Sequence, residues 1–356
     1  MQFTDTTPGE ILKIMRDLKA SSYPDDICPG WLMKANAKTL ALDICKVINL
    51  SLQLGIVPGK MKHAIVTPLL KKVGLDINDP LNFRPISAIP FLAKILEQVV
   101  FRQLQNHFEG GNLFHDTQSW FRPGIGIEIS VLAMRERLLT IRDAGGSAAL
   151  ILLDLSAAFD TVDYDILLDR LKNLFGLNGV VLSWIRSFLH ERTQCVKMGT
   201  HRSTPRPLTC GVPQGSALSP LLFNCYVCPL ADIIQNNNLE CQLYADDTQI
   251  LVDSARGPQQ PVQLAKCLVE IQDWMAGNRL GLNAAKTEVL LIGPTSPLLL
   301  AAWPLSFGPT PIPAKQVKNL GVIIDDTLSF VPHFRNILRN ANYHLRLLRK
   351  VKHLFT

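Results

Sequence analysis

The 356-residue sequence predicts an α+β fold in which helices flank an antiparallel sheet. Three observations support this prediction. Several long segments carry apolar residues at helical spacing, whereas other apolar runs are too short for a helix and indicate strands. The two kinds of segment do not alternate strictly, which disfavours an all-parallel sheet. With 47% hydrophobic and 19% charged residues, the chain has a globular composition and is long enough for two or three subdomains.

Residues 1–54 are predicted to form a helical extension. Helical segments are expected at 9–20 and 37–55, on either side of the proline-rich loop "SSYPDDICPG". Asp25 and Asp26 lie in that loop, where aspartates commonly stabilise turns. We therefore assign no chemistry to this pair.

A strand is expected next, over residues 63–70, "HAIVTPLL", followed by Lys71 and Lys72. After a polar loop, one face of a long amphipathic helix carries eight apolar residues: Phe91, Leu92, Ile95, Leu96, Val99, Val100, Leu104 and Phe108. Such a stripe indicates a helix packed against a core.

The central part of the sequence predicts a second set of strands. The run "AALILL", 148–153, is apolar and short, and it ends at Asp154. The run "CQLYADDTQILV", 241–252, indicates two strands joined by a tight turn at residues 245–247. Helices are expected near 164–175, 179–190 and 261–276, a turn leading into a helix in "CGVPQGSALSPLLFNCYV", and a strand followed by a turn in "VKNLGVIIDD".

Three aspartates stand at the ends of these predicted strands, namely Asp154, Asp246 and Asp247. Each alone is a weak signal, because strands often end at an aspartate that serves a turn or a helix cap. If the strands are neighbours, however, three clustered carboxylates require cations to stay ionised. Carboxylate oxygens suit Mg²⁺, and two ions about 4 Å apart favour in-line displacement at phosphorus.

The net charge of +6 is concentrated at the C-terminal end. The last thirty residues contain no Asp or Glu and six basic residues, Arg335, Arg339, Arg346, Arg349, Lys350 and Lys352, among apolar residues at roughly helical spacing. Such a basic amphipathic helix can bind a membrane, an acidic partner or a phosphate backbone.

Other classes of protein are disfavoured. No run of 18 apolar residues and no secretory signal is present, so we expect no membrane role and an intracellular location, in cytoplasm or nucleus. Of the eight cysteines, only Cys225 and Cys228 have a metal-like spacing, and no second pair follows. Small buried side chains are therefore the favoured interpretation of these cysteines over a structural zinc site.

Eight motifs follow one another over nearly 290 residues: "AIVTPLLKK", "NFRPISAIPFLAKILEQVV", "QSWFRPG", "LLDLSAAFDTVD", "GVPQGSALSPLLFNCYV", "YADD", "LGLNAAKTE" and "NLGVIIDDTLSF". With them, the chain resembles the reverse transcriptase of non-LTR (LINE-type) retrotransposons from about Met61 to Arg349. The resemblance implies a right-hand polymerase fold, with fingers and palm over 55–325 and the beginning of a truncated, basic helical thumb over 326–356.

The resemblance also implies roles for individual residues. Asp154, Asp246 and Asp247 would be the catalytic ligands of two Mg²⁺ ions, with Mn²⁺ as a possible substitute. The incoming deoxynucleoside triphosphate would be held or selected by Lys71, Arg84, the backbone of Ala157 and Ala158, the gate residue Phe159, Gln214, and Lys286 as proton donor to pyrophosphate. Without the resemblance, these would be surface charges, packing residues, a core aromatic and a helix cap.

Template and primer contacts are implied at Arg122 and, in the basic tail, at Arg335, Arg339 and Arg346. The implied activity adds deoxynucleotides to the 3′-OH of a DNA primer on an RNA template. Asp325 and Asp326, which repeat the letters "DDT" with Thr327, match a late hairpin whose residues are structural.

The chain departs from the family pattern at "QSWFRPGIGIEISVL", with Trp120 for Gly and the His-Ser-Thr lost, and at Tyr164, where His is usual. An alternative to an active polymerase is therefore a catalytically weak, truncated remnant that folds and binds nucleic acid. A viral-type RNA-dependent RNA polymerase is disfavoured, because Phe159 stands where those enzymes usually have a second aspartate. The oligomeric state stays open.

Overall fold

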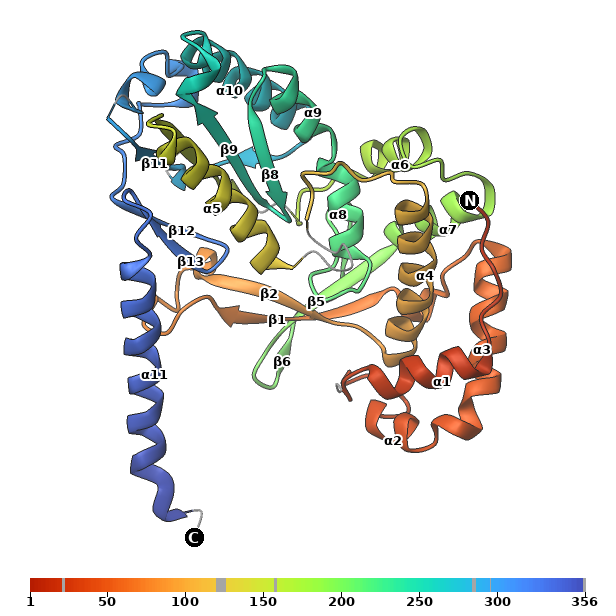
Figure 1. The fold of residues 1–356 in the computed structure, drawn as a ribbon. Coiled ribbons are helices and arrows are strands. Elements are labelled where there is room, and N and C mark those ends of the chain that lie inside the picture. The colour runs from red at the N-terminus through yellow and green to blue at the C-terminus, as the bar shows by residue number, and fades with distance from the viewer. Residues whose placement is uncertain (21–22, 120–125, 157–158, 284–285, 295, 355–356) are drawn as a thin grey trace. The chain divides into compact units, whose positions relative to one another are not determined.

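The computed structural model describes the chain except for residues 21–22, 120–125, 157–158, 284–285, 295 and 355–356 (Figure 1). It divides into two compact units, each discontinuous in sequence. Unit 1 comprises Met1–His115, Ala157–Cys228 and Asn278–Leu280. Unit 2 comprises Asp116–Ser156, Pro229–Gly277 and Gly281–Thr356.

Unit 1 is built from helices around one sheet. The helices are α1 (Pro8–Asp17), α2 (Gly30–Ala35), α3 (Ala37–Leu54), α4 (Phe91–Gly110), α6 (Tyr164–Asn173), α7 (Gly179–Leu189) and α8 (Ser219–Val227). The strands are β1 (His63–Leu70), β2 (Phe83–Ala88), β5 (Arg192–Met198), β6 (His201–Arg202) and β7 (Arg206–Leu208). The strand predicted at 63–70 and the helices predicted near 164 and 179 are confirmed.

The sheet of unit 1 has the order β2-β1-β5-β6, with β7 paired to β5. β1 lies antiparallel to β2 and parallel to β5, so the predicted strand is an interior strand of the sheet. Neither β2 nor β5 was predicted from the sequence. Their polar and proline-containing sequences, "FRPISA" and "RTQCVKM", lack a clear strand pattern, and pairing with β1 stabilises them.

Aromatic side chains are buried where the helices of unit 1 pack together. Trp184 on α7 is fully buried, stacks on Phe188 with ring centroids 5.7 Å apart, and donates a 3.0 Å hydrogen bond to Ser51 on α3. The buried face of α4 includes Leu96, Val100 and most of the other residues predicted for it.

Asp25 and Asp26 have structural roles in unit 1, as expected for the proline-rich loop. Asp25 forms an ion pair with Arg202 at 2.7 Å. Asp26 accepts a 3.1 Å hydrogen bond from the backbone N–H of Phe91, the first residue of α4. This carboxylate therefore satisfies one of the free donors at a helix N-terminus.

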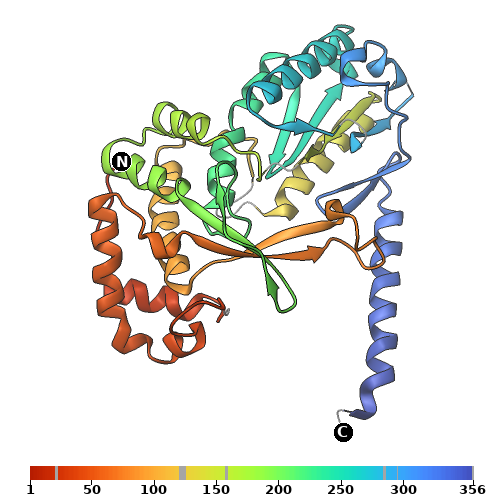
Figure 2. The same cartoon turned by 180° about the vertical axis from the view of Figure 1, so that it is seen from behind.

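Unit 2 contains the second sheet. Its helices are α5 (Ile127–Asp143), α9 (Pro229–Asn236), α10 (Gln260–Gly277) and α11 (Val331–Val351). Its strands are β3 (Ala148–Leu153), β4 (Leu155–Ser156), β8 (Glu240–Tyr244), β9 (Asp247–Asp253), β10 (Gly281–Leu282), β11 (Glu288–Ile292), β12 (Gln316–Asn319) and β13 (Val322–Asp325). The main sheet has the order β11-β3-β9-β8 and is antiparallel throughout. α5 covers one face of this sheet and α10 the other (Figures 1 and 2).

The predicted strand at 148–153 is confirmed as β3, and the predicted pair joined by a tight turn is β8 and β9. The helix α5 was not predicted, because it follows the unusual "QSWFRPG" motif and has only a narrow apolar stripe. It buries Met134, Leu138 and Ile141 in the same core as Leu150 of β3 and Leu290 of β11.

The segment "VKNLGVIIDD" was predicted as one strand and a turn from its local pattern, and this prediction was wrong. The structure has a hairpin of β12 and β13, in agreement with the late hairpin implied by the family resemblance. The chain reverses at Leu320 and Gly321, with φ of 47° and 90°, and glycine is favoured at such angles.

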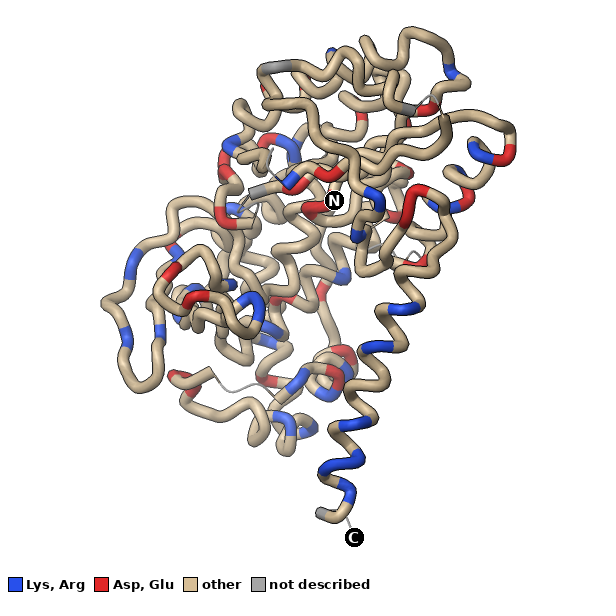
Figure 3. Tube along the Cα trace, turned by 90° about the vertical axis from the view of Figure 1, so that its left-hand side faces the viewer, with Lys and Arg blue, Asp and Glu red and all other residues tan. Residues whose placement is uncertain are grey.

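The basic tail forms the helix α11, as expected. None of the described residues of α11 is buried, and Phe334 and Leu338 are each 61% exposed. Basic residues recur along the helix without an acidic one (Figure 3). In the described part of the chain, no helix combines the length and apolarity needed to cross a membrane.

Candidate active site

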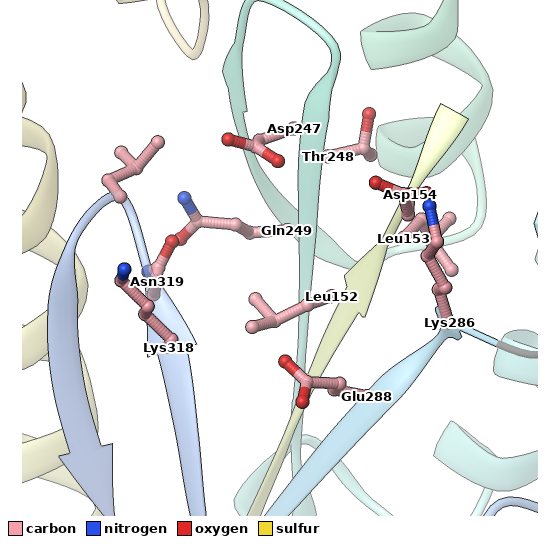
Figure 4. Close-up of a pocket in the computed structure, with 11 residues that line it drawn as sticks. Leu152, Leu153, Asp154, Asp247, Thr248, Gln249, Lys286, Glu288, Lys318 and Asn319 are labelled. Carbon is pink, nitrogen blue, oxygen red and sulfur yellow. Dashed lines mark hydrogen bonds and ion pairs between the residues drawn. The ribbon is translucent and has the colours of Figure 1, made fainter. Parts of the chain in front are cut away.

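The antiparallel pairing of β3 and β9 brings Asp154 close to Asp247. Leu153, the last residue of β3, pairs with Thr248 of β9. Asp154 follows Leu153, and Asp247 precedes Thr248, so both aspartates emerge at the same end of the two strands. They line one pocket together with Gln249 (Figure 4).

Asp246 lies in the turn between β8 and β9. The turn is tight, since Tyr244 pairs with Asp247 and the intervening Ala245 has a φ of 55°. Local backbone geometry thus presents two consecutive carboxylates at the strand end. A non-glycine residue at this angle is uncommon, and such residues recur at functional sites.

Electrostatics link the three aspartates. The pKa of Asp247 is raised to about 6, first by burial of its carboxylate among protein atoms and then by the charges of Asp246 and Asp154. Part of the Asp247 side chain remains open to solvent. The site therefore holds more negative charge than its surroundings stabilise, and a cation could approach it.

Lys286 supplies one positive charge. Its Nζ lies 3.1 Å from Asp154 Oδ2, and both side chains line the pocket (Figure 4). The backbone N–H of Asn283 donates to the carbonyl of Asp154, which fixes the start of this loop beside the strand end. Since the Lys286 side chain is 65% exposed, the ion pair contributes little stability and can be displaced.

The donor chemistry of these residues fits a hard divalent cation. Carboxylate oxygens are the ligands that Mg²⁺ prefers, and a cation would offset the burial and the charge repulsion that together raise the pKa of Asp247. Among the described residues, no three His, Cys, Asp or Glu side chains already converge closely enough to hold a metal ion. Asp154, Asp246 and Asp247 are the residues that would hold one.

Four of the described residues expected at the nucleotide belong to unit 1. Phe159 stacks on Phe223, with ring centroids 4.7 Å apart and an interplanar angle of 26°. Gln214 Nε2 donates to both carboxylate oxygens of Asp160 at 3.1 Å. Lys71 on the surface donates to the carbonyl of Leu81, and Arg84 is exposed on β2.

Three expected residues, Arg122, Ala157 and Ala158, lie outside the described residues. Arg335, Arg339 and Arg346 are exposed on α11. Within unit 2, Asp154, Asp247 and Lys286 thus line one pocket, and Asp246 is next to Asp247 in the chain. Within unit 1, the segment that carries Gln214 lies beside the segment that carries Phe159, because Val212 N donates to Phe159 O at 2.8 Å.

Asp160, which lies beside Phe159 and Gln214 in unit 1, was not predicted as a site residue. Asp160 holds the Gln214 amide, and burial raises the pKa of Asp160, whereas the hydrogen bond from Gln214 lowers it. The signal was present in the sequence, since Asp160 directly follows Phe159 in "SAAFD". A carboxylate in that position could equally have been a turn residue.

The sequence matches the family described as reverse transcriptase (RNA-dependent DNA polymerase) over residues 70–324. The chain belongs to this reverse transcriptase family. That match includes Asp154, Asp246 and Asp247, and it confirms the resemblance found in the sequence. Reverse transcriptases use divalent metal ions and bind a nucleic-acid template.

The chain is similar to curated relatives that are named as RNA-directed DNA polymerases of transposons and mobile elements. It is 27% identical over 353 residues to the probable RNA-directed DNA polymerase from transposon BS of Drosophila melanogaster, covering 96% of this chain and 38% of that protein. It is 28% identical to the polymerase from the mobile element jockey of the same species, over 82% and 32% of the two chains. The chain thus spans less than two-fifths of the length of these relatives.

Solved structures support the polymerase fold. The reverse transcriptase chain aligns with apo telomerase from Candida tropicalis, truncated from its C-terminal domain, with a TM-score of 0.52 and 12% identity over 77% of this chain and 55% of that one. Telomerase from Candida albicans, in complex with a fragment of telomeric RNA, aligns with a TM-score of 0.51 and 13% identity over 85% and 49% of the two chains. The predicted right-hand polymerase fold is confirmed.

Proposed function

We propose that this reverse transcriptase domain is an RNA-directed DNA polymerase of a LINE-type retrotransposon, which adds deoxynucleotides to a primer 3′-OH. The proposal rests chiefly on the β3–β9 pairing, which carries Asp154 and Asp247 into one pocket. The raised pKa of Asp247 supports it, because a divalent cation would stabilise the charged form of a carboxylate that is partly buried and lies beside two others.

Asp154, Asp246 and Asp247 would hold two Mg²⁺ ions, for which Mn²⁺ could substitute. When bound, the metal ions would activate the primer hydroxyl and stabilise charge on the leaving pyrophosphate. Lys286, whose ammonium already lies at Asp154, is placed in this proposal to donate a proton to the pyrophosphate. The hydrogen bond from Lys286 Nζ to Asp154 supports a position of this ammonium group near the reacting phosphates.

The nucleotide would be held by residues of unit 1. Phe159 would pack against the sugar and exclude a 2′-hydroxyl, a role supported by its stacking on Phe223, which limits the ring's freedom to move aside. Gln214 would line the pocket, held by Asp160. Lys71 and Arg84 would bind the triphosphate, a ligand for which guanidinium geometry is well suited, together with the backbone N–H groups of Ala157 and Ala158.

An RNA template and a DNA primer would be bound by Arg122 and by the basic face of α11. Arg335, Arg339 and Arg346 are exposed on a helix without acidic residues, which favours a phosphate backbone as partner. We further propose the organisation inferred from the sequence: a helical extension at 1–54, fingers and palm at 55–325, and the beginning of a thumb at 326–356.

Primer extension tests this function. The chain should extend a DNA primer on an RNA template with deoxynucleotides in the presence of Mg²⁺, and the Asp246→Asn variant should not. A preference for ribonucleotides would instead indicate an RNA polymerase.

A second candidate function is binding without turnover. Two observations favour it. Among the described residues, no three metal-binding side chains lie close enough together to hold an ion, and the "QSWFRPG" motif is altered. In the same experiment, an RNA–DNA hybrid that the chain binds in a gel-shift assay but does not extend would support this second function.

A further inference from the structure

The loop that carries Gln214 is held in place by hydrogen bonds from three different segments of unit 1. Ser87 of β2 donates its backbone N–H to the carbonyl of Gln214 at 2.9 Å. Asp160 accepts from the Gln214 side chain. The third holder is Glu97, whose Oε2 accepts from Ser216 Oγ at 2.7 Å and from the backbone N–H of Ala217 at 2.9 Å.

Glu97 is an unusual residue for its position. It lies in the middle of α4 on the helix face that packs against the core, and it is 3% exposed. Burial raises the pKa of Glu97, whereas Arg192, Ser216, Ala217 and Lys94 lower it. A buried carboxylate is costly, and an apolar side chain of similar size often gives an equally stable core.

The charge that faces Glu97 is itself buried. Arg192 is 2% exposed, donates to the carbonyl of Phe188 at 3.2 Å and lies over the Phe188 ring. Its second terminal nitrogen, Nη2, has no hydrogen-bond partner among the described residues. The Arg192 guanidinium is therefore incompletely satisfied, and packing stability alone does not explain why a carboxylate occupies position 97.

Glu97 accepts its two hydrogen bonds from a loop that fits tightly against its neighbours. Gly215 has a φ of 113°, and a Cβ atom there would lie 2.8 Å from the carbonyl oxygen of Ser87, so the loop lies directly against β2. Ser216 Oγ also accepts the N–H of Leu218, and Ser219 Oγ donates to the carbonyl of Pro213. Glu97 thus holds the chain directly after Gln214 and Gly215, and its loss would free one end of the loop.

We infer that Glu97 is a positioning residue for the nucleotide pocket: by holding Ser216 and Ala217, it fixes the direction in which Gln214 points. This inference rests on the proposed function, in which Gln214 lines that pocket. Glu97 itself touches no substrate. Its loss should weaken the binding of the incoming nucleotide and leave the binding of template and primer unchanged.

The test uses the full chain and the variants Glu97→Ala, Glu97→Gln and Ser216→Ala. Ser216→Ala removes one of the same hydrogen bonds from the loop side and leaves the buried carboxylate in place. It therefore provides the test if Glu97→Ala fails to fold. Glu109→Gln is the control, because Glu109 is an exposed glutamate on the same helix. Glu97→Gln keeps one acceptor oxygen and should restore part of what Glu97→Ala loses.

The first measurement is hydrogen exchange at the loop, which does not depend on activity. Losing one to two hydrogen bonds should speed exchange at Ala217 and its neighbours by about tenfold, with little change at β1. The second measurement is the affinity for dTTP of a Mg²⁺ complex with an RNA template and a dideoxy-terminated DNA primer. Glu97→Ala should weaken dTTP binding about tenfold at unchanged affinity for the hybrid, and in primer extension KM should rise more than kcat falls.

The outcomes separate this inference from the proposed function. Faster loop exchange with unchanged dTTP affinity would overturn the inference even if the chain polymerises. A uniform loss of protection across unit 1 with unchanged dTTP affinity would reduce Glu97 to a packing residue. If the parent chain binds dTTP but never extends a primer, the proposed function fails, and the dTTP affinities of the variants still decide the role of Glu97. If the parent chain binds no dTTP, both fail.

Discussion

Lys286 Nζ and Asp154 Oδ2 lie 3.1 Å apart, although 132 positions separate the two residues in the sequence. The ammonium group neutralises part of a site in which Asp154, Asp246 and Asp247 repel one another. A metal ion bound by the aspartates would take over that role and compete with the lysine for Asp154. The ion pair therefore connects metal binding to the position of Lys286.

We expect Mg²⁺ to raise the melting temperature of the chain, because a ligand that binds only the folded state stabilises it, by about 2.7 kcal/mol at a concentration 100 times its dissociation constant. Lys286→Gln should increase this rise, since the competing ammonium is gone. Lys266→Gln, which removes a lysine paired with Glu270 on α10, is the control. A melting temperature that does not respond to Mg²⁺, measured by calorimetry, would contradict the metal site.

Asp246→Asn should remove primer extension with little effect on the fold, because it deletes a charge and keeps the shape. The matched control is Asp325→Asn, which changes the other "DDT" and should leave turnover nearly intact. Single-turnover rates at saturating Mg²⁺, with circular dichroism to verify folding, check this prediction. Loss of turnover in a folded Asp325→Asn protein, with Asp246→Asn still active, would show that the wrong pair was chosen.

Asp325→Asn should lower stability in a pH-dependent way. Burial acts to raise the pKa of Asp325, but hydrogen bonds from Thr327, Ser329 and Phe330 outweigh it, so the pKa is lowered. The carboxylate thus stabilises the fold above its unfolded-state pKa of about 3.9, and this contribution is lost as the pH falls through the lower folded-state value. The variant should be roughly 1 kcal/mol less stable at pH 7, as for loss of a helix cap, and closer to the parent near pH 3. Urea unfolding at both pH values measures this; an equal difference at both would argue against it.

Phe159→Val should raise the incorporation of ribonucleotides relative to deoxynucleotides, because it opens room for a 2′-hydroxyl. Since the ring stacks on Phe223, the variant should also lose a few kcal/mol of stability. Phe114→Ala, which removes another buried ring of unit 1, controls for destabilisation alone. The ratio of kcat/KM for the two nucleotides decides: the gate role is wrong if Phe159→Val keeps the parent's ratio, or if Phe114→Ala changes it equally.

Replacing Arg335, Arg339 and Arg346 with Gln should weaken binding to an RNA–DNA hybrid about equally for all sequences. Each lost phosphate contact should flatten the salt dependence by about 0.9 units of slope. The same change at Lys13, Lys19 and Lys38, exposed lysines of unit 1, alters the net charge equally and should have a smaller effect. Fluorescence anisotropy across a salt series measures both. If the two triple variants behave alike, α11 does not hold the duplex.

Much of the local structure could be predicted from the sequence. β1 and β3 lie at the predicted residues, because each is a short apolar run bounded by polar residues. Strands such as β5 and the helix α5 could not be predicted in this way. Their patterns are weak, and they form because a neighbouring strand or core accepts them, which is information held elsewhere in the chain.

The sequence by itself determined that Asp154, Asp246 and Asp247 stand at strand ends, since strand and turn preferences act over a few neighbouring residues. It also determined the charge of the tail. Only the tertiary structure decided how the two "DDT" segments are held: Asp325 accepts backbone hydrogen bonds from Thr327, Ser329 and Phe330, whereas Asp247 lines a pocket with Asp154. It likewise decided that Glu97 is buried at Ser216. The physical reason is that strand register and burial depend on contacts between residues about a hundred positions apart, and no local pattern encodes which partners meet.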